Sequence, residues 1–134
     1  MYSLTLNNRI EEIPSLAAFI EEVCEAAGAN ASVTMNMNLA LEEAVTNVML
    51  YAYPAGEQGT VTVTAEVAKG ALTFVITDSG KAFDPTAQAE ADVTLGVEER
   101  PIGGLGIFLV RQLMDRVDYE RKDGCNVLTL VKQL

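Results

Sequence analysis

The chain has 134 residues, of which 19 are acidic, nine are basic and none is histidine, which gives a formal net charge of −10. That charge has the wrong sign for holding a phosphate backbone or an anionic bilayer, so we expect neither nucleic acid nor a membrane as a partner. The absence of histidine excludes a Ser-His-Asp triad, a His-ligated zinc site and a histidine phosphoacceptor within this chain.

The length predicts a single domain over residues 1–134, which would bury roughly two-thirds of the surface of the unfolded chain. Cys24 and Cys125 lie far apart without CxxC spacing, so we expect two reduced thiols. The first residues lack a basic segment followed by an apolar run, and no apolar stretch approaches membrane-spanning length. The sequence therefore predicts a cytoplasmic protein.

Charge is unevenly distributed along the chain. Nine carboxylates and no Lys or Arg occur between Arg9 and Lys69. Two explanations are open: that half of the surface binds a basic partner, or its carboxylates serve only to keep the protein soluble.

The first half of the chain predicts one strand followed by two helices. Leu4 and Leu6 alternate with polar neighbours, as in a short edge strand, before the turn-forming Asn7-Asn8. Residues 11–27 carry apolar side chains at helical spacing before Gly28. A second helix is expected to start near Ser32, as its cap, and to run to about Tyr53, where Pro54 ends it. At 100° per residue its buried stripe would be Met37, Leu41, Ala44, Val45, Val48 and Ala52.

The second half predicts a hairpin, a long loop, a helix and two strands. Residues 61–67 and 72–76 alternate around a turn at Lys69-Gly70, and the second strand ends at Asp78. Residues 82–101 lack periodicity, which favours a mobile surface segment. A helical pattern follows the glycines at 103–106, and strands are expected from Val117 and over residues 127–131.

Three short motifs could carry chemistry. Glu43 and Asn47 are i, i+4 neighbours, so a carboxylate and an amide oxygen could converge on one Mg²⁺-binding and hydroxyl-activating site. Asp78 could accept a hydrogen bond from an exocyclic amine where its strand opens, and Gly80 would leave room for a flat ring. Taken singly, the first motif is also typical of a solvated helix face and the second of a plain Asp-Ser-Gly turn.

The third motif is the run Gly103, Gly104, Leu105 and Gly106 before a helix. Such a turn presents free backbone N–H groups and the positive end of the helix dipole to a phosphate. A flexible connector would look the same, and the Walker pattern GxxxxGK[ST] is absent.

In their order, the motifs resemble the N box and the two glycine boxes of the GHKL, or Bergerat-fold, ATP-binding superfamily. LEEAVTNVMLYAYP, DSGKAFDP, GGLGIFLVRQLMDRVDY and NVLTLVKQL are most similar to the anti-sigma-factor serine kinases of partner-switching systems. The resemblance covers nearly the whole chain. It implies an α+β fold, a two-layer α/β sandwich whose mixed, largely antiparallel sheet carries helices on one face.

The resemblance also implies roles for these residues. Asn47 would coordinate Mg²⁺ on the triphosphate of ATP, and Glu43 would accept the proton of a serine hydroxyl. Asp78 would bind the adenine amino group and Gly80 would line the base, while the 103–106 run would close on the phosphates. Lys81 and Arg100 flank the expected lid and are candidate phosphate contacts.

The implied function is an ATP-dependent serine kinase that phosphorylates an anti-sigma-factor antagonist of the STAS type. The same chain would hold a sigma factor and form a homodimer. Two departures from the family pattern are Ala82, where a second glycine is frequent, and Tyr51, where a histidine is frequent. The alternatives are a regulatory module that binds ATP without phosphotransfer, and an α/β interaction domain in which the motifs are accidental.

Overall fold

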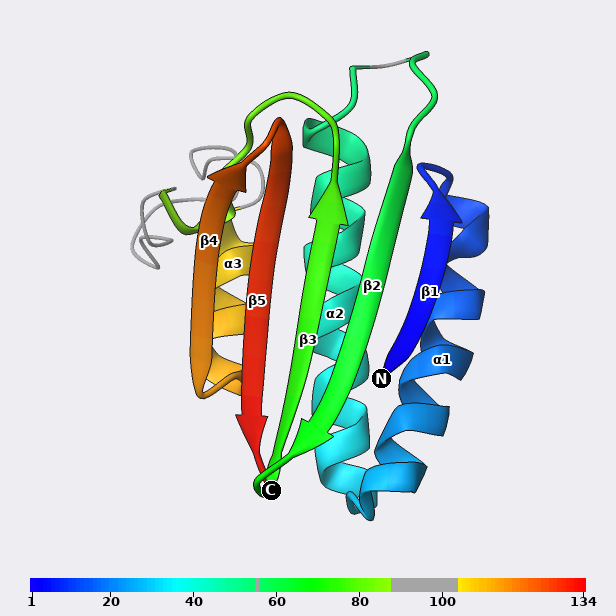
Figure 1. The fold of residues 1–134 in the computed structure, drawn as a ribbon, viewed down its shortest axis with the longest axis vertical. Helices are drawn as coiled ribbons and strands as arrows, with labels where there is room; N and C mark the ends of the chain where they lie inside the picture. Colours follow the sequence, from blue (N-terminus) through cyan, green and yellow to red (C-terminus); the bar gives the residue numbers. More distant parts are fainter. Residues whose placement is uncertain (55, 88–103) are drawn as a thin grey trace.

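The computed structural model describes residues 1–54, 56–87 and 104–134 (Figure 1). It contains three α-helices and five strands over these residues. In chain order they are β1 Tyr2–Asn7, α1 Ile13–Ala27, α2 Ala31–Tyr51, β2 Thr60–Ala68, β3 Ala71–Asp78, α3 Gly104–Leu113, β4 Arg116–Lys122 and β5 Cys125–Gln133.

The strands form one sheet in the order β1-β2-β3-β5-β4. Figure 1 shows the three helices on one face of this sheet, so the predicted α+β sandwich is confirmed. All four pairings among the described strands are antiparallel, where a mixed, largely antiparallel sheet was predicted. The hairpin turn lies where expected, and Lys69 and Gly70 both have positive φ, at 54° and 74°, as a type I′ turn requires.

The hydrophobic core lies between the helices and the sheet. Each strand sends alternate side chains into it, which is why the alternating pattern identified the strands. The α2 helix lies between α1 and α3 and packs against both. Its predicted stripe is confirmed as buried: Met37, Leu41, Ala44, Val45, Val48 and Ala52 are each at most 4% exposed.

The starts of both long helices differ from the predictions. A 3-10 turn at Ile10–Glu12 precedes α1, so the α-helix begins at Ile13 and not at residue 11. The cap of α2 is Asn30 and not Ser32, because the Asn30 Oδ1 accepts a hydrogen bond from the Val33 N–H at 2.8 Å. Asn and Ser are about equally good caps, so sequence alone did not separate them.

The α2 helix ends at Tyr51, two residues before the predicted end. Tyr53 precedes Pro54, whose ring disfavours helical backbone in the residue before it. Tyr53 is nevertheless 6% exposed, because it leaves the helix and turns into the protein. Because the helix ends at Tyr51, Ala52 and Tyr53 lie beyond it and form hydrogen bonds with the loop after β3.

Two further sequence predictions concern the long loop and the membrane. Of the segment predicted at residues 82–101, Pro85–Ala87 form a short 3-10 helix, and residues 88–101 lie outside the described residues. Among the described residues, no helix has the length and apolar character needed to cross a bilayer.

The N-cap of α2 gives a first prediction. Asn30→Ala should lower the free energy of unfolding by about 1 kcal/mol, because it removes the acceptor for the Val33 N–H. Urea denaturation monitored by far-UV circular dichroism measures this change. Ser32→Ala is the matched control and should leave stability within about 0.5 kcal/mol. A larger loss for Ser32→Ala than for Asn30→Ala would contradict the assignment of the cap.

Candidate functional site

The Asp78 carboxylate is buried at the end of β3, where it is 3% exposed. Its Oδ1 accepts hydrogen bonds from the Gly80 N–H and from the Asn126 Nδ2, both at 2.9 Å. Its Oδ2 is also buried but has no hydrogen-bond partner among the residues that the structure describes. A buried acceptor without a donor is costly, so this oxygen is suited to a donor supplied by a bound molecule.

Burial raises the pKa of the Asp78 carboxyl above its ordinary value. The hydrogen bonds from Asn126 and Gly80 and the charge of Arg121 act in the opposite direction, but burial is the larger effect. The carboxyl is therefore held in an environment that disfavours its negative charge.

Asn126 orients Asp78 from the neighbouring strand. The two residues are directly opposite each other in the β3–β5 register. The Asn126 Nδ2 donates to the Asp78 Oδ1 and to the Lys81 carbonyl, at 2.9 and 2.8 Å. Both amide hydrogens are thus used, and the amide cannot rotate without losing a bond to β3 or to the loop that follows it.

The Asn126 Oδ1 accepts three hydrogen bonds at the same point. The donors are the Phe83 N–H at 3.1 Å, the Tyr119 hydroxyl and the Arg121 Nη1 at 3.1 Å. Arg121 also donates to the Gly80 carbonyl at 2.9 Å. Burial raises the pKa of the Tyr119 hydroxyl, which keeps it protonated as a donor. The residues after Asp78 are therefore tied to β4 and β5.

Asn126, Tyr119 and Arg121 were not among the residues that the sequence predicted for the site. One signal was available: Asn126, Leu128 and Leu130 share the core-facing side of β5, and all are nearly fully buried. A polar side chain at a buried position of a strand usually forms a hydrogen bond within the protein. The partner of Asn126 is Asp78, 48 residues earlier in the chain, and this pairing could not be predicted without the register of β3 and β5.

The same loop is attached to the end of α2. The Lys81 N–H donates to the Ala52 carbonyl at 2.8 Å, and the Ser79 N–H donates to the Tyr53 hydroxyl at 3.1 Å. The Tyr53 hydroxyl in turn donates to the Thr60 carbonyl at 2.7 Å. These bonds hold the loop against the helix that carries Glu43 and Asn47.

Gly80 is required by this close approach. A Cβ at this position would lie 2.3 Å from the Ala52 carbonyl oxygen, which is part of the backbone and cannot move aside cheaply. The structure therefore gives the glycine a packing reason at the end of α2, in addition to the room for a ring that the motif suggested.

Glu43, Asn47 and Tyr51 follow one another at four-residue steps, so they share one face of α2. Asn47 is 7% exposed and Glu43 is half-buried, and neither side chain hydrogen bonds to a described residue. The Tyr51 ring contacts the Phe83 ring, with centroids 5.6 Å apart. The face that carries Glu43 and Asn47 thus continues into the loop after Asp78.

The other residues predicted for the site are the glycine-rich run at 103–106, Lys81 and Arg100. Gly104, Leu105 and Gly106 form the first turn of α3, which packs against α2. Figure 1 places that turn at the same end of the molecule as the end of β3. The Lys81 side chain is exposed. Arg100 and Gly103 lie outside the described residues.

A metal ion would not find a preformed acidic cage here. Among the residues that the structure describes, no group of three Asp, Glu, Cys or His side chains could hold an ion. Mg²⁺ is commonly held by one or two protein oxygens together with phosphate oxygens and water, which fits a single ligand such as the Asn47 amide.

The fold and this polar end define a two-layer α/β domain with a buried carboxylate at a strand end and two helices beside it. The chain belongs to the histidine kinase-like ATPase domain family, whose family model matches residues 6–132. This match confirms the superfamily that the three motifs indicated.

The curated relatives are serine kinases. The chain is 29% identical over 101 residues to the serine/threonine-protein kinase BtrW of Bordetella bronchiseptica, over 75% of this chain and 71% of the relative. It is 33% identical to the serine-protein kinase RsbW of Halalkalibacterium halodurans, over 74% of this chain and 62% of the relative. It is 30% identical to RsbW of Listeria monocytogenes, over 79% and 70%. These relatives confirm the resemblance to this kinase group.

The fold has solved counterparts. The histidine kinase domain of the Erythrobacter litoralis EL346 blue-light activated histidine kinase matches 89% of this chain and 61% of its own, with a TM-score of 0.61 and 16% identity. A longer chain of the same kinase gives a TM-score of 0.59, with 17% identity over 89% of this chain and 42% of its own. These likenesses confirm the fold.

The raised pKa of Asp78 predicts a pH-dependent stability. The folded protein holds the Asp78 proton more tightly than the unfolded chain does, so wild-type stability falls as pH rises from the unfolded pKa, about 3.9, to the folded value. Asp78→Asn lacks this loss. Its free energy of unfolding relative to wild type should therefore increase with pH above about 4 and then level off.

Urea denaturation of both proteins between about pH 3.5 and pH 7 measures the difference. Glu66→Gln, which removes an exposed carboxylate on β2, is the control and should not reproduce the rise. A difference between Asp78→Asn and wild type that is flat across this range would refute the described environment of the carboxyl.

Proposed function

We propose that the chain binds Mg²⁺-ATP at the polar end of the sheet and transfers the γ-phosphoryl group to a serine of a partner protein. By resemblance, that partner is an anti-sigma-factor antagonist of the STAS type, and the chain otherwise holds a sigma factor. The observation that carries the proposal is the buried Oδ2 of Asp78 beside the loop of Gly80, to which no described residue donates a hydrogen bond.

The adenine would be recognised by Asp78. Its Oδ1 is occupied by Gly80 and Asn126, so only Oδ2 remains to accept a hydrogen bond from the amino group of the base. The Asn126 amide and the bond from Lys81 to Ala52 fix the carboxylate and its loop before the ligand arrives. Such fixed donors and acceptors reduce the ordering cost of binding.

The phosphates would lie between α2 and the first turn of α3. The N–H groups of Gly104, Leu105 and Gly106 belong to the first turn of α3, where they have no partner within the helix, so they can donate to phosphate oxygens without a charged side chain. The Asn47 amide oxygen would be the protein ligand of Mg²⁺, which neutralises charge on the triphosphate when bound. Lys81 and Arg100 are further candidate contacts to the phosphates.

Glu43 would act on the serine of the partner. One turn from Asn47, its carboxylate would accept the hydroxyl proton as the serine oxygen bonds to the γ-phosphorus and the bond from that phosphorus to the bridging oxygen of ADP breaks. Positioning supplies most of the rate in such transfers, which is consistent with a site built from two helices and a fixed loop. A homodimer is implied by the resemblance alone.

Two substitutions separate binding from transfer. Asn47→Ala should weaken Mg²⁺-ATP binding by about tenfold or more, because it removes the proposed metal ligand. Glu43→Gln should leave binding within about twofold and reduce the rate of phosphotransfer by roughly 10² to 10⁴. Binding can be followed with a fluorescent ATP analogue, since the chain has no Trp, and transfer by radiolabelling the cognate antagonist.

Asn36→Ala, on the same helix and without a proposed role, is the matched control for Asn47→Ala. Saturable, Mg²⁺-dependent binding that is insensitive to Asn47→Ala would contradict the proposed metal ligand. A wild-type protein that binds ATP but never labels a serine partner would refute the kinase and leave the regulatory ATP-binding module. No binding of nucleotide at all would refute both.

A further inference from the structure

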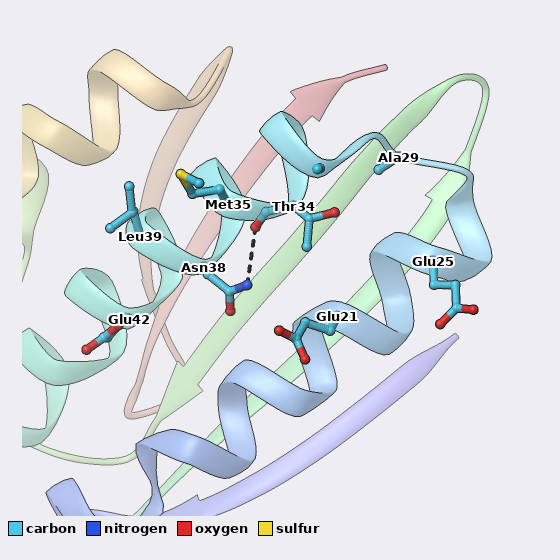
Figure 2. A pocket seen from close by; sticks show the side chains of 9 residues that line it. Glu21, Glu25, Ala29, Thr34, Met35, Asn38, Leu39 and Glu42 are labelled. Atoms are coloured by element: carbon cyan, nitrogen blue, oxygen red, sulfur yellow. Dashed lines mark hydrogen bonds between the residues drawn. The ribbon is translucent and has the colours of Figure 1, made fainter.

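A groove runs between α1 and α2 on the face of the helical layer that points away from the sheet (Figure 2). It has a volume of about 560 Å³. The residues that line the groove include Glu21 and Glu25 from α1 and Met35, Asn38, Leu39 and Glu42 from α2. The groove begins at the turn between the helices, at the opposite end of α2 from its contact with the loop after Asp78.

The groove presents apolar surface to solvent. Met35 is 63% exposed and Leu39 is 45% exposed, although α2 already buries its other face against the sheet and its flanks against α1 and α3. The two residues are four positions apart, so they form a continuous ridge along the helix. A solvent-facing helix surface is ordinarily polar, and a ridge of this kind is typical of a contact surface.

Three glutamates make the rim of the groove acidic. Glu21 and Glu25 are i, i+4 neighbours on α1, an arrangement of like charges that destabilises a helix, and Glu42 faces the same groove from α2 (Figure 2). None of the three carboxylates forms a hydrogen bond or an ion pair with a residue that the structure describes. Residues 10–68 contain no Lys or Arg, so neither helix can supply one.

We infer that this groove docks a basic amphipathic helix of a partner protein. One apolar edge of that helix would pack on Met35 and Leu39, and its Lys or Arg side chains would lie beside Glu21, Glu25 and Glu42. A groove between two antiparallel helices fits the ridge of a third, and the Asn38 amide offers a polar contact within it. Solubility alone would explain the acidic residues but not the exposed apolar pair in the same groove.

This docking surface is separate from the nucleotide site and goes beyond the proposed kinase activity. Within the described part of the chain, no hydrogen bond joins these groove residues to Asp78, Asn126 or the loop after β3. Substitutions in the groove should therefore leave binding of the fluorescent ATP analogue unchanged. That measurement also shows whether each variant is folded.

The test uses a fluorescein-labelled synthetic peptide of about 18 residues, with Leu at i, i+4, i+7 and i+11 on one helical face and Lys on both flanks. Fluorescence anisotropy measures its binding to the full chain. We expect saturable binding that weakens as salt is raised from about 0.05 to 0.3 M. Glu21→Gln and Glu25→Gln should each weaken it about two- to fivefold, and Leu39→Ser about five- to tenfold.

Matched controls distinguish the groove from general attraction to an acidic protein. Glu22→Gln removes an exposed carboxylate from the same helix, and Leu50→Ser removes a 55% exposed leucine from α2, both outside the groove. Both should leave peptide binding within about 1.5-fold, and a scrambled peptide of identical composition should bind at least about tenfold more weakly. No saturable binding, equal binding of the scrambled peptide, or control effects as large as those of the groove variants would each overturn the inference.

Discussion

The hydrogen bond from the Asn126 amide to the Asp78 carboxylate is the constraint on which the site depends. It joins two adjacent strands at the end where the chain leaves the sheet, and the other carboxylate oxygen has no donor in the described part of the chain. The second hydrogen of the same amide is donated to the Lys81 carbonyl, so one side chain orients both the carboxylate and the loop after β3. The hydrogen bonds of the Asn126 amide hold the Asp78 carboxylate in place, and Oδ2 remains available to accept a hydrogen bond from a ligand. Such an acceptor is preorganised for binding.

The α2 helix connects this acceptor with the rest of the molecule. Its last turn and the residues after it contact the loop after β3 through Ala52 and Tyr53, and the same helix carries Glu43 and Asn47. Its first half instead exposes apolar residues beside the acids of α1 (Figure 2). One helix thus contributes to both candidate surfaces, and the two are separated along its length.

The fold and part of the site could be predicted because both depend on local pattern. Alternation located the strands, and helical spacing located the buried stripe of α2. The end of β3 at Asp78 was also predicted, but the burial of the Asp78 side chain was not. The role of Asn126 could not be predicted in this way, because its contacts with Asp78 and Lys81 span more than 40 residues and arise only from strand register. The Asn30 cap was missed because two good capping residues lie two positions apart.

The most direct test of the account compares the affinity of wild-type protein for Mg²⁺-ATP with its affinity for purine riboside triphosphate, which lacks only the amino group of the base. If the free oxygen of Asp78 accepts a hydrogen bond from that amino group, the analogue should bind at least about tenfold more weakly, since a buried acceptor would again be left without a donor. Equal affinity of the two nucleotides would contradict the central claim.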